Sequence, residues 1–271
     1  MKYIEIKEMK IPALGLGTWD LRGKHCTDAV LSALDFGYRH LDTAQMYANE
    51  ERIGEALRRT DVPRKDIFLT TKIRPPRLAY GDVLESFAVS LDKLQTDYVD
   101  LLLIHWPSSK VPVSETIKAM NELQADKQVT HIGVSNFSVQ QTREAMDASR
   151  TPIITNQVHY DPFRSQSQLL EFCIQNDIML TAYSPLAKGR AVNNSKLQEI
   201  GEKYGKTAAQ VTLRWLTQQN NVSAIPKAGT PDHQQENLNI FDFELSWEDM
   251  EKIFELHGGV FKKLRSLIGI I

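Results

Sequence analysis

The run VDLLLIH, at residues 99–105, decides the predicted fold. Four apolar side chains follow one another at residues 101–104, so the segment lacks the alternation of a strand with one solvated face. A strand that is apolar on both faces is typical of a parallel sheet covered by helices. The run ends on a polar residue, His105, where the carboxyl end of the strand is expected.

Similar β-rich runs are spread along the whole chain. They are expected at residues 13–18, 39–43, 67–72, 131–136, 153–157, 178–183 and 222–227. Amphipathic segments separate them; in residues 82–94, for example, Val83, Phe87 and Leu91 recur at helical spacing. Strands that alternate with helices predict parallel pairing with right-handed crossovers. A closed α/β barrel of the (β/α)8 TIM type is the simplest fold of this kind.

An open doubly wound sheet is the alternative architecture. It is expected to carry G-x-G-x-x-G after its first strand, whereas the glycines here are Gly15, Gly17 and Gly23. The barrel is therefore favoured. The residues before the first strand alternate like a β-hairpin that would plug one barrel end, and an extra helix is expected before strand eight, in residues 195–205 and 207–219. Without a visible linker, residues 1–271 are expected to form one domain.

Composition narrows the class of protein. The chain has 271 residues and a formal net charge of −2, which gives no electrostatic reason to expect nucleic acid or an anionic membrane as a partner. Cys26 and Cys173 lack metal-ligand or disulfide spacing, so no metal site and a reducing, cytoplasmic location are expected. The first residues lack the apolar core of a signal peptide, and no run is long enough to span a membrane.

Polar residues stand at the ends of seven of the predicted strands. They are Asp42, Lys72, His105, Ser135 with Asn136, Gln157, Tyr183 and Lys227. In a barrel these ends converge on one face, where active sites are built. A single polar strand end is usually a local cap, but the convergence of so many predicts an active site.

Asp42, Tyr47, Lys72 and His105 form the candidate catalytic group. A free phenol has a pKa near ~10, and the Lys72 ammonium, held by Asp42, would lower the pKa of Tyr47. His105 would orient a substrate oxygen or share in the proton transfer. The sequence offers neither a metal-ligand cluster nor paired thiols, so a reduction would need hydride from a bound cofactor.

At this point the motifs resemble those of a known family. GYRHLDTAQMYANEERIGEAL, FLTTK, DLLLIHWP, HIGVSNF, TNQVHYDP, YSPLAKG and IPKAGTPDHQQENL follow one another as in aldo-keto reductases, particularly the short prokaryotic members related to 2,5-diketo-gluconate reductases. The resemblance implies a monomeric barrel that reduces aldehydes or ketones, with Tyr47 as general acid. The implied cofactor is NADP(H), with NAD(H) as the alternative. It also implies that Trp19 and Trp106 wall the substrate pocket beside Tyr47 and His105.

A cofactor site is implied by the same resemblance. Ser135, Asn136 and Gln157 would bind the nicotinamide carboxamide, and Tyr183 would stack on the ring. The other implied contacts are Thr18, Trp19, the pyrophosphate loop Ser184, Pro185, Leu186, Lys188 and Gly189, and the adenosine-end residues Pro226, Lys227, Ala228, His233, Glu236 and Asn237. Ala228 and His233 stand where the family usually carries Ser and an Arg that grips the 2′-phosphate, and an imidazole cannot replace that guanidinium. NADPH is still favoured over NADH, because Lys227 offers one charge.

Two alternative functions stay open, and several other residues are expected to have structural roles. A cofactor-sensing regulatory subunit is one alternative function; a Schiff-base lyase using Lys72 is another, although Asp42 would keep that amine protonated. Asn49 is the predicted N-cap of the helix that follows, Trp215 is assigned to the core, and His131 and His159 to structural roles. His159 and Asp161 stand where many relatives have Glu and His, a departure that weakens a detailed prediction of specificity but leaves the candidate catalytic group intact. The tail SLIGII is expected to pack against the body, and the short C-terminal segment to leave the pocket open.

Overall fold

The computed structural model describes residues 2–257, and in it the opening run forms strand β6 (Val99–Ile104) of an eight-stranded parallel sheet. The strand order is β10-β9-β8-β7-β6-β5-β4-β3. The other strands are β3 (Leu16–Gly17), β4 (His40–Asp42), β5 (Phe68–Ile73), β7 (Val129–Ser135), β8 (Ile153–His159), β9 (Met179–Tyr183) and β10 (Val222–Ile225). The strands therefore follow one another in space as in the chain.

Two backbone bridges close the sheet into a barrel by joining the edges at β3 and β10. They pair Leu14 with Ala224 and Gly17 with Lys227. Gly17 allows this close approach, because a Cβ atom on it would lie 2.6 Å from the carbonyl oxygen of Ile225. The predicted closed barrel is thus confirmed, and the closure depends on a residue without a side chain.

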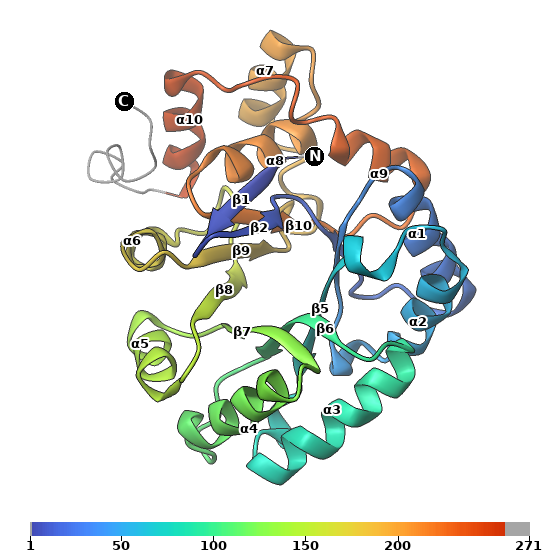
Figure 1. The fold of residues 1–271 in the computed structure, drawn as a ribbon. Coiled ribbons are helices and arrows are strands. Elements are labelled where there is room, and N and C mark those ends of the chain that lie inside the picture. Colours follow the sequence, from blue (N-terminus) through green and yellow to red (C-terminus); the bar gives the residue numbers. More distant parts are fainter. Residues whose placement is uncertain (1, 258–271) are drawn as a thin grey trace.

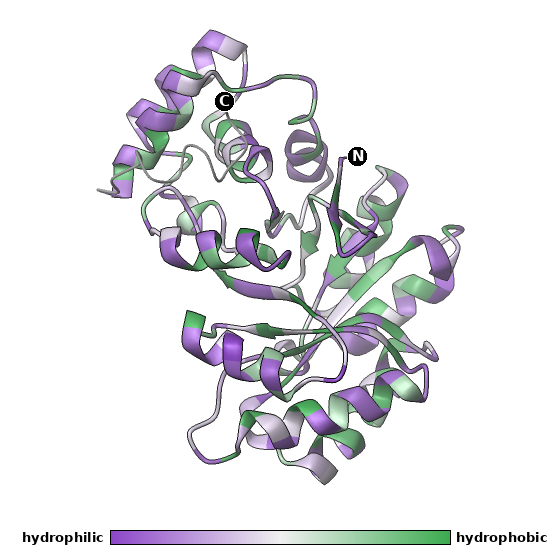
Figure 2. Cartoon of the chain, turned by 60° about the vertical axis from the view of Figure 1, so that its left-hand side comes forward, coloured by the Kyte–Doolittle hydropathy of each residue, from purple (hydrophilic) through white to green (hydrophobic). Residues whose placement is uncertain are grey.

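Helices surround the strands (Figure 1). They are α1 (Gly23–Asp35), α2 (Glu50–Arg59), α3 (Tyr80–Leu94), α4 (Val113–Ala125), α5 (Val139–Ala148), α6 (Ser167–Gln175), α7 (Ser195–Tyr204), α8 (Ala208–Gln218), α9 (Pro231–Leu238) and α10 (Trp247–Phe254). Figure 2 shows mainly hydrophobic colour on the central strands and mixed colour on the helices, as expected when each helix packs one apolar face on the barrel. Trp215 on α8 is fully buried against Tyr160 and Phe254, which confirms its core assignment.

A small hairpin covers the amino-terminal end of the barrel. Strands β1 (Tyr3–Ile6) and β2 (Met9–Pro12) pair antiparallel. From them Ile6 and Ile11 pack into a buried cluster with Ile154 and Met179, which lie near the starts of β8 and β9. The predicted plug is therefore present, and it leaves the opposite end, at the carboxyl ends of the strands, open.

The predicted strands agree with the structure to within a few residues, and α7 and α8 are the two helices expected before strand eight. The predicted packing of the SLIGII tail falls at residues 266–271, outside the described residues, as does most of the C-terminal segment. Within residues 2–257, no helix has the length and apolar character needed to cross a membrane.

Candidate active site

A cavity of about 600 Å³ opens at the carboxyl ends of the strands. Its lining is Gly17, Trp19, Asp42, Met46, Tyr47, His105, Trp106, Ser135, Asn136, Gln157, His159, Arg164, Tyr183, Ser184, Lys188, Ile225 and Lys227. A volume of this order suits a small organic molecule. The polar strand ends were predicted to converge on one face, and in the structure they line a single cavity or, for Lys72, lie directly beneath it bonded to Asp42.

Asp42 and Lys72 form a buried ion pair at the floor of this cavity. The ammonium Nζ of Lys72 lies 2.5 Å from Oδ1 of Asp42 and donates to the carbonyl oxygen of Thr43 at 2.8 Å. Burial lowers the pKa of Lys72, but Asp42 and Tyr47 raise it, and the net shift is upward. The amine is therefore protonated at neutral pH and is a poor nucleophile, which argues against Schiff-base chemistry.

Tyr47 places its hydroxyl over this ion pair. It belongs to a short 3-10 helix, Gln45–Tyr47, and its oxygen lies 3.4 Å from Nζ of Lys72. Lys72 lowers the pKa of Tyr47, as expected, but burial raises it by more, so the net shift is upward. The prediction of a lowered phenol pKa is thus wrong for the protein without ligands. The reason is desolvation, which penalises the phenolate more than one ammonium stabilises it.

His105 stands beside Tyr47, with its ring centroid 5.7 Å from that of the tyrosine in an edge-to-face arrangement. Burial, together with the nearby Lys72 charge, lowers the pKa of His105 to about 3. The ring is therefore neutral over the physiological range. A neutral imidazole can donate one hydrogen bond to a substrate oxygen, but it is not an acid that protonates that oxygen.

The residues at the ends of β7, β8 and β9 bond to one another. Ser135 Oγ donates to the carbonyl oxygen of Gln157 at 2.8 Å, and Asn136 Nδ2 lies 3.0 Å from both Ser135 Oγ and the carbonyl oxygen of His105. Asn136 has a φ of +63°, in the left-handed region that Asn tolerates better than most residues. Tyr183 then donates to Asn136 Oδ1 at 2.9 Å. The cluster is held in place before any ligand binds.

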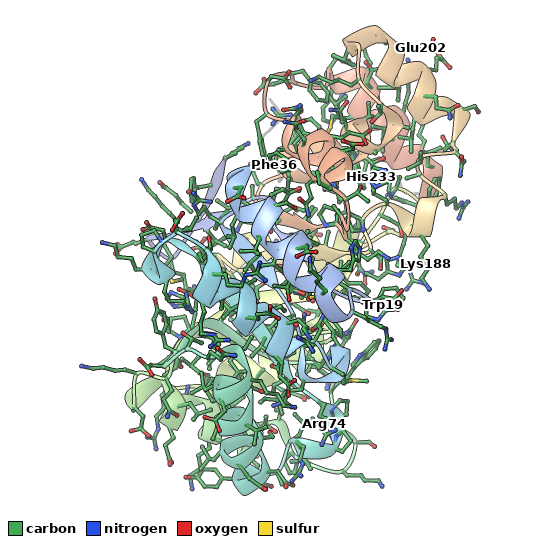
Figure 3. The ribbon with its side chains drawn as sticks, turned by 90° about the vertical axis from the view of Figure 1, so that its right-hand side faces the viewer. Trp19, Phe36, Arg74, Lys188, Glu202 and His233 are labelled. Carbon is green, nitrogen blue, oxygen red and sulfur yellow. The ribbon has the colours of Figure 1, made fainter. Side chains whose placement is uncertain are left out.

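The rim of the cavity combines aromatic and cationic side chains. Trp19 is 55% exposed, and the Lys188 ammonium lies 5.9 Å from its ring centroid (Figure 3). Lys227 lies 4.0 Å from Asp20 on the same rim. Ser184, Ala187 and Lys188 all have positive φ, a strained backbone of the kind that clusters at binding sites. This rim offers two ammonium groups to an anionic ligand.

Comparison with known proteins identifies the group to which this barrel belongs. The model of the aldo/keto reductase family matches residues 13–257. The chain belongs to the aldo/keto reductase family. It is 40% identical over 250 residues to a glyoxal reductase of Bacillus subtilis, covering 92% of this chain and 90% of the relative. It is also 40% identical over 253 residues to a 9,11-endoperoxide prostaglandin H2 reductase of Trypanosoma cruzi, covering 92% and 89%.

Solved structures agree with this aldo/keto reductase fold. A putative 2,5-diketo-D-gluconic acid reductase B matches with a TM-score of 0.93 and 44% identity, covering 94% of this chain and 91% of that one. An aldo-keto reductase complexed with NADPH matches with a TM-score of 0.87 and 32% identity, covering 94% and 87%. The family resemblance read from the motifs is thereby confirmed.

Not every predicted cofactor residue lines the cavity of this aldo/keto reductase. Thr18 is buried and donates to the carbonyl oxygen of Asp42 at 2.9 Å. His233 and Glu236 lie on α9; His233 is exposed, and Glu236 accepts from Thr207. The predicted contacts that are absent from the cavity lining are Thr18, Pro185, Leu186, Gly189, Pro226, Ala228, His233, Glu236 and Asn237. Their cofactor roles remain predictions.

Asn49 occupies the predicted N-cap position of α2, but its side chain bonds to other groups than the helix. It makes no capping hydrogen bond to α2. Instead its Nδ2 donates to the carbonyl oxygens of Thr18 and Leu21, and its Oδ1 accepts from Thr43. The predicted capping bond is therefore wrong. A capping bond would need Oδ1 as its acceptor, and that oxygen instead accepts from the Thr43 hydroxyl, while Nδ2 satisfies two buried loop carbonyls.

Five lining residues were not predicted from the sequence: Gly17, Met46, His159, Arg164 and Ile225. The ring centroid of His159 lies 5.5 Å from that of Tyr183 in a stacked arrangement, and His159 Nε2 lies 2.7 Å from Oδ2 of Asp161 without hydrogen-bond alignment. A usable signal existed for His159, because it lies two residues after Gln157 and so faces the same side of β8. Met46 and Arg164 lie outside the strands, where no periodicity points to the cavity.

Proposed function

We propose that this aldo/keto reductase reduces aldehydes or ketones to alcohols with NADP(H), and that Tyr47 is the general acid. The observation that carries the proposal is the placement of the Tyr47 hydroxyl 3.4 Å from the buried Lys72 ammonium, at the floor of an open cavity. The raised pKa keeps the phenol protonated at neutral pH. It can then give its proton only to an oxygen that gains negative charge during the reaction.

The residues at the cavity suit a nicotinamide dinucleotide. When bound, this cofactor supplies the hydride that the protein's own side chains cannot provide. Asn136, Ser135 and Gln157 offer amide and hydroxyl groups for a carboxamide, and Tyr183 offers an aromatic face. Lys188 and Lys227 at the rim provide charge for phosphates. The name of one similar structure, an aldo-keto reductase complexed with NADPH, supports the same assignment.

In the proposed reaction Asp42, Tyr47, Lys72 and His105 form a catalytic tetrad, and each member has one task. Tyr47 donates the proton to the carbonyl oxygen. The Lys72 ammonium stabilises the phenolate left behind, and Asp42 holds Lys72 within reach of it. His105, neutral because its pKa is lowered to about 3, orients the carbonyl oxygen by a hydrogen bond.

The substrate is proposed as a carbonyl compound with an apolar substituent. Trp19, Met46 and Trp106 are 55%, 57% and 45% exposed, and all three line the cavity. Large apolar side chains that face water at a cavity mouth provide a surface for an apolar ligand. A monomer in a reducing cytoplasm is also proposed; the unpaired, buried thiols of Cys26 and Cys173 support the reducing compartment.

The direct test replaces Tyr47 with Phe. Tyr47→Phe should abolish aldehyde-dependent NADPH oxidation while leaving NADPH affinity, followed by tryptophan fluorescence, close to that of the wild type. Tyr204→Phe is the matched control, because Tyr204 bonds to Asp249 and lies outside the cavity lining. Undiminished turnover in Tyr47→Phe would exclude the proposed mechanism. Binding of NADPH without turnover of any carbonyl in the wild type would favour the cofactor-sensing alternative.

A further inference from the structure

The short turn that carries Tyr47 is held by the side chain of its first residue. Gln45 is the first residue of the 3-10 helix that ends at Tyr47. Its amide nitrogen Nε2 donates at 3.1 Å to both the carbonyl oxygen of Ser86 and the hydroxyl oxygen of Ser90, two residues of α3. Its oxygen Oε1 accepts from the backbone N–H of Arg74, which follows β5, at 3.1 Å. One side chain therefore ties the turn both to a helix and to the end of a barrel strand.

These three bonds fix the orientation of the Gln45 amide and use both of its N–H donors. The carbonyl oxygen of Ser86 can only accept, and the backbone N–H of Arg74 can only donate. The amide nitrogen must therefore face α3, and the amide oxygen must face the end of β5. Ser90, which takes the second N–H, is almost fully buried and donates to the carbonyl oxygen of Ser86. The anchor thus requires an amide at this position, because the side chain has to donate and accept at once.

The rest of the turn offers no second anchor of this kind. In residues 44–48, AQMYA, Gln45 and Tyr47 alone carry a nitrogen or oxygen atom in the side chain. The hydroxyl of Tyr47 lies 3.4 Å from Nζ of Lys72, which is longer than a typical hydrogen bond. Such a long contact holds the phenol weakly, so the position of the phenol follows the backbone of the turn. That backbone is held by Gln45.

We propose that Gln45 is a positioning residue, which sets where the phenol of Tyr47 stands relative to Lys72 and to the carbonyl oxygen of a bound substrate. This inference rests on the proposed function. Proton transfer needs the donor within hydrogen-bond distance of that oxygen, and a displacement of about 1 Å can cost about a hundredfold in rate. Gln45 does not line the cavity, so it acts through the backbone of the turn. Without its three bonds the turn can move away from α3 and take the phenol with it.

Single-turnover hydride transfer in Gln45→Met tests this proposal. Methionine keeps the length of the side chain but offers no N–H donor. With enzyme saturated by NADPH and aldehyde, the rate should fall about tenfold or more, while the NADPH dissociation constant, followed by tryptophan fluorescence, stays within about twofold of the wild type. Gln218→Met is the matched control. The amide of Gln218 on α8 also joins two segments, through two bonds of 2.9 Å to the backbone of Leu245, but it has no bond to the turn, so this variant should keep the wild-type rate.

A double-mutant comparison separates positioning of the phenol from general damage to the site. In the Tyr47→Phe background no phenol proton is left to position, so Gln45→Met should lower the remaining rate by less than about twofold. Ser90→Ala, which removes one acceptor of the amide, should show the same dependence on Tyr47 with a smaller loss, and it decides the question if Gln45→Met does not fold. Equal losses in both backgrounds, or the wild-type rate in the folded deciding variant, would overturn the proposal. Failure of the proposed function looks different, because Tyr47→Phe alone would then keep the wild-type rate.

Discussion

Asp42 and Lys72 meet although they are out of register on their neighbouring strands. Asp42 pairs across the sheet with Thr70, and Lys72 lies two residues further along β5 on the same face, so its ammonium reaches back to Oδ1 at 2.5 Å. Both side chains are almost fully buried. Strand geometry therefore holds the pair at the cavity floor, where the Lys72 ammonium lies 3.4 Å from the hydroxyl of Tyr47.

Removing one charge of this pair should destabilise the protein more than removing both. Lys72→Met leaves the Asp42 carboxylate buried without its cation, and we expect a loss of about 3–5 kcal/mol in the free energy of unfolding. Chemical denaturation of the cofactor-free protein measures this. The double variant Asp42→Asn with Lys72→Met, which has no buried charge at this point, should be more stable than Lys72→Met alone. If it is equally or less stable, the ion pair is not the source of the loss.

The neutral state of His105 should make stability depend on pH. The pKa of His105 is about 3 in the folded protein and near 6.5 when it is exposed, so below pH 6.5 the unfolded chain binds a proton that the folded chain does not. Stability should therefore fall as the pH decreases from 6.5 toward 3. His40, whose burial lowers its pKa to about 4, acts in the same direction.

Denaturation of the wild type and His105→Gln at several pH values isolates this contribution. Glutamine is uncharged in both states, so the variant should lose stability less steeply with acid, by about 1 kcal/mol or more across the window. Identical slopes in the two proteins would mean that His105 is charged in the folded state or exposed.

Gly17 should tolerate no side chain. Gly17→Ala would place a Cβ 2.6 Å from the carbonyl oxygen of Ile225, at the bridge that closes the barrel, and should destabilise the protein by about 1–3 kcal/mol. Gly81→Ala on α3 is the control, because its Cβ would meet nothing within 4 Å, and alanine favours a helix over glycine by about 1 kcal/mol. Thermal denaturation should show a melting temperature below that of the wild type for Gly17→Ala and above it for Gly81→Ala.

The rim lysines should bind the cofactor through charge. Lys188→Met and Lys227→Met should each weaken NADPH binding about fivefold or more, and the affinity of each variant should depend less on salt than that of the wild type. Lys196→Met on α7, outside the cavity lining, is the matched control. Unchanged affinity in both rim variants would place the phosphates elsewhere.

The fold and the meeting of Asp42, Lys72 and His105 at one end of the barrel could be predicted because both follow from local patterns. Apolar runs mark the strands, and each polar strand end marks one side chain at the open face. The direction of the Tyr47 pKa shift could not be predicted, since it depends on how deeply the phenol is buried. The role of Asn49 was hidden because its partners, Thr18 and Leu21, come from a different loop. Met46 lies in the short 3-10 helix and Arg164 outside the helices and strands, and no periodic residue pattern marks either one as facing the cavity.

The central claim is that Tyr47 gives its proton to the substrate oxygen, and single-turnover hydride transfer tests it most directly. Enzyme saturated with NADPH is mixed with an aldehyde, and the loss of cofactor absorbance is followed in wild type and Tyr47→Phe. We predict a rate at least about a hundredfold lower in the variant, with NADPH binding preserved. A hydride-transfer rate equal to that of the wild type would contradict the account.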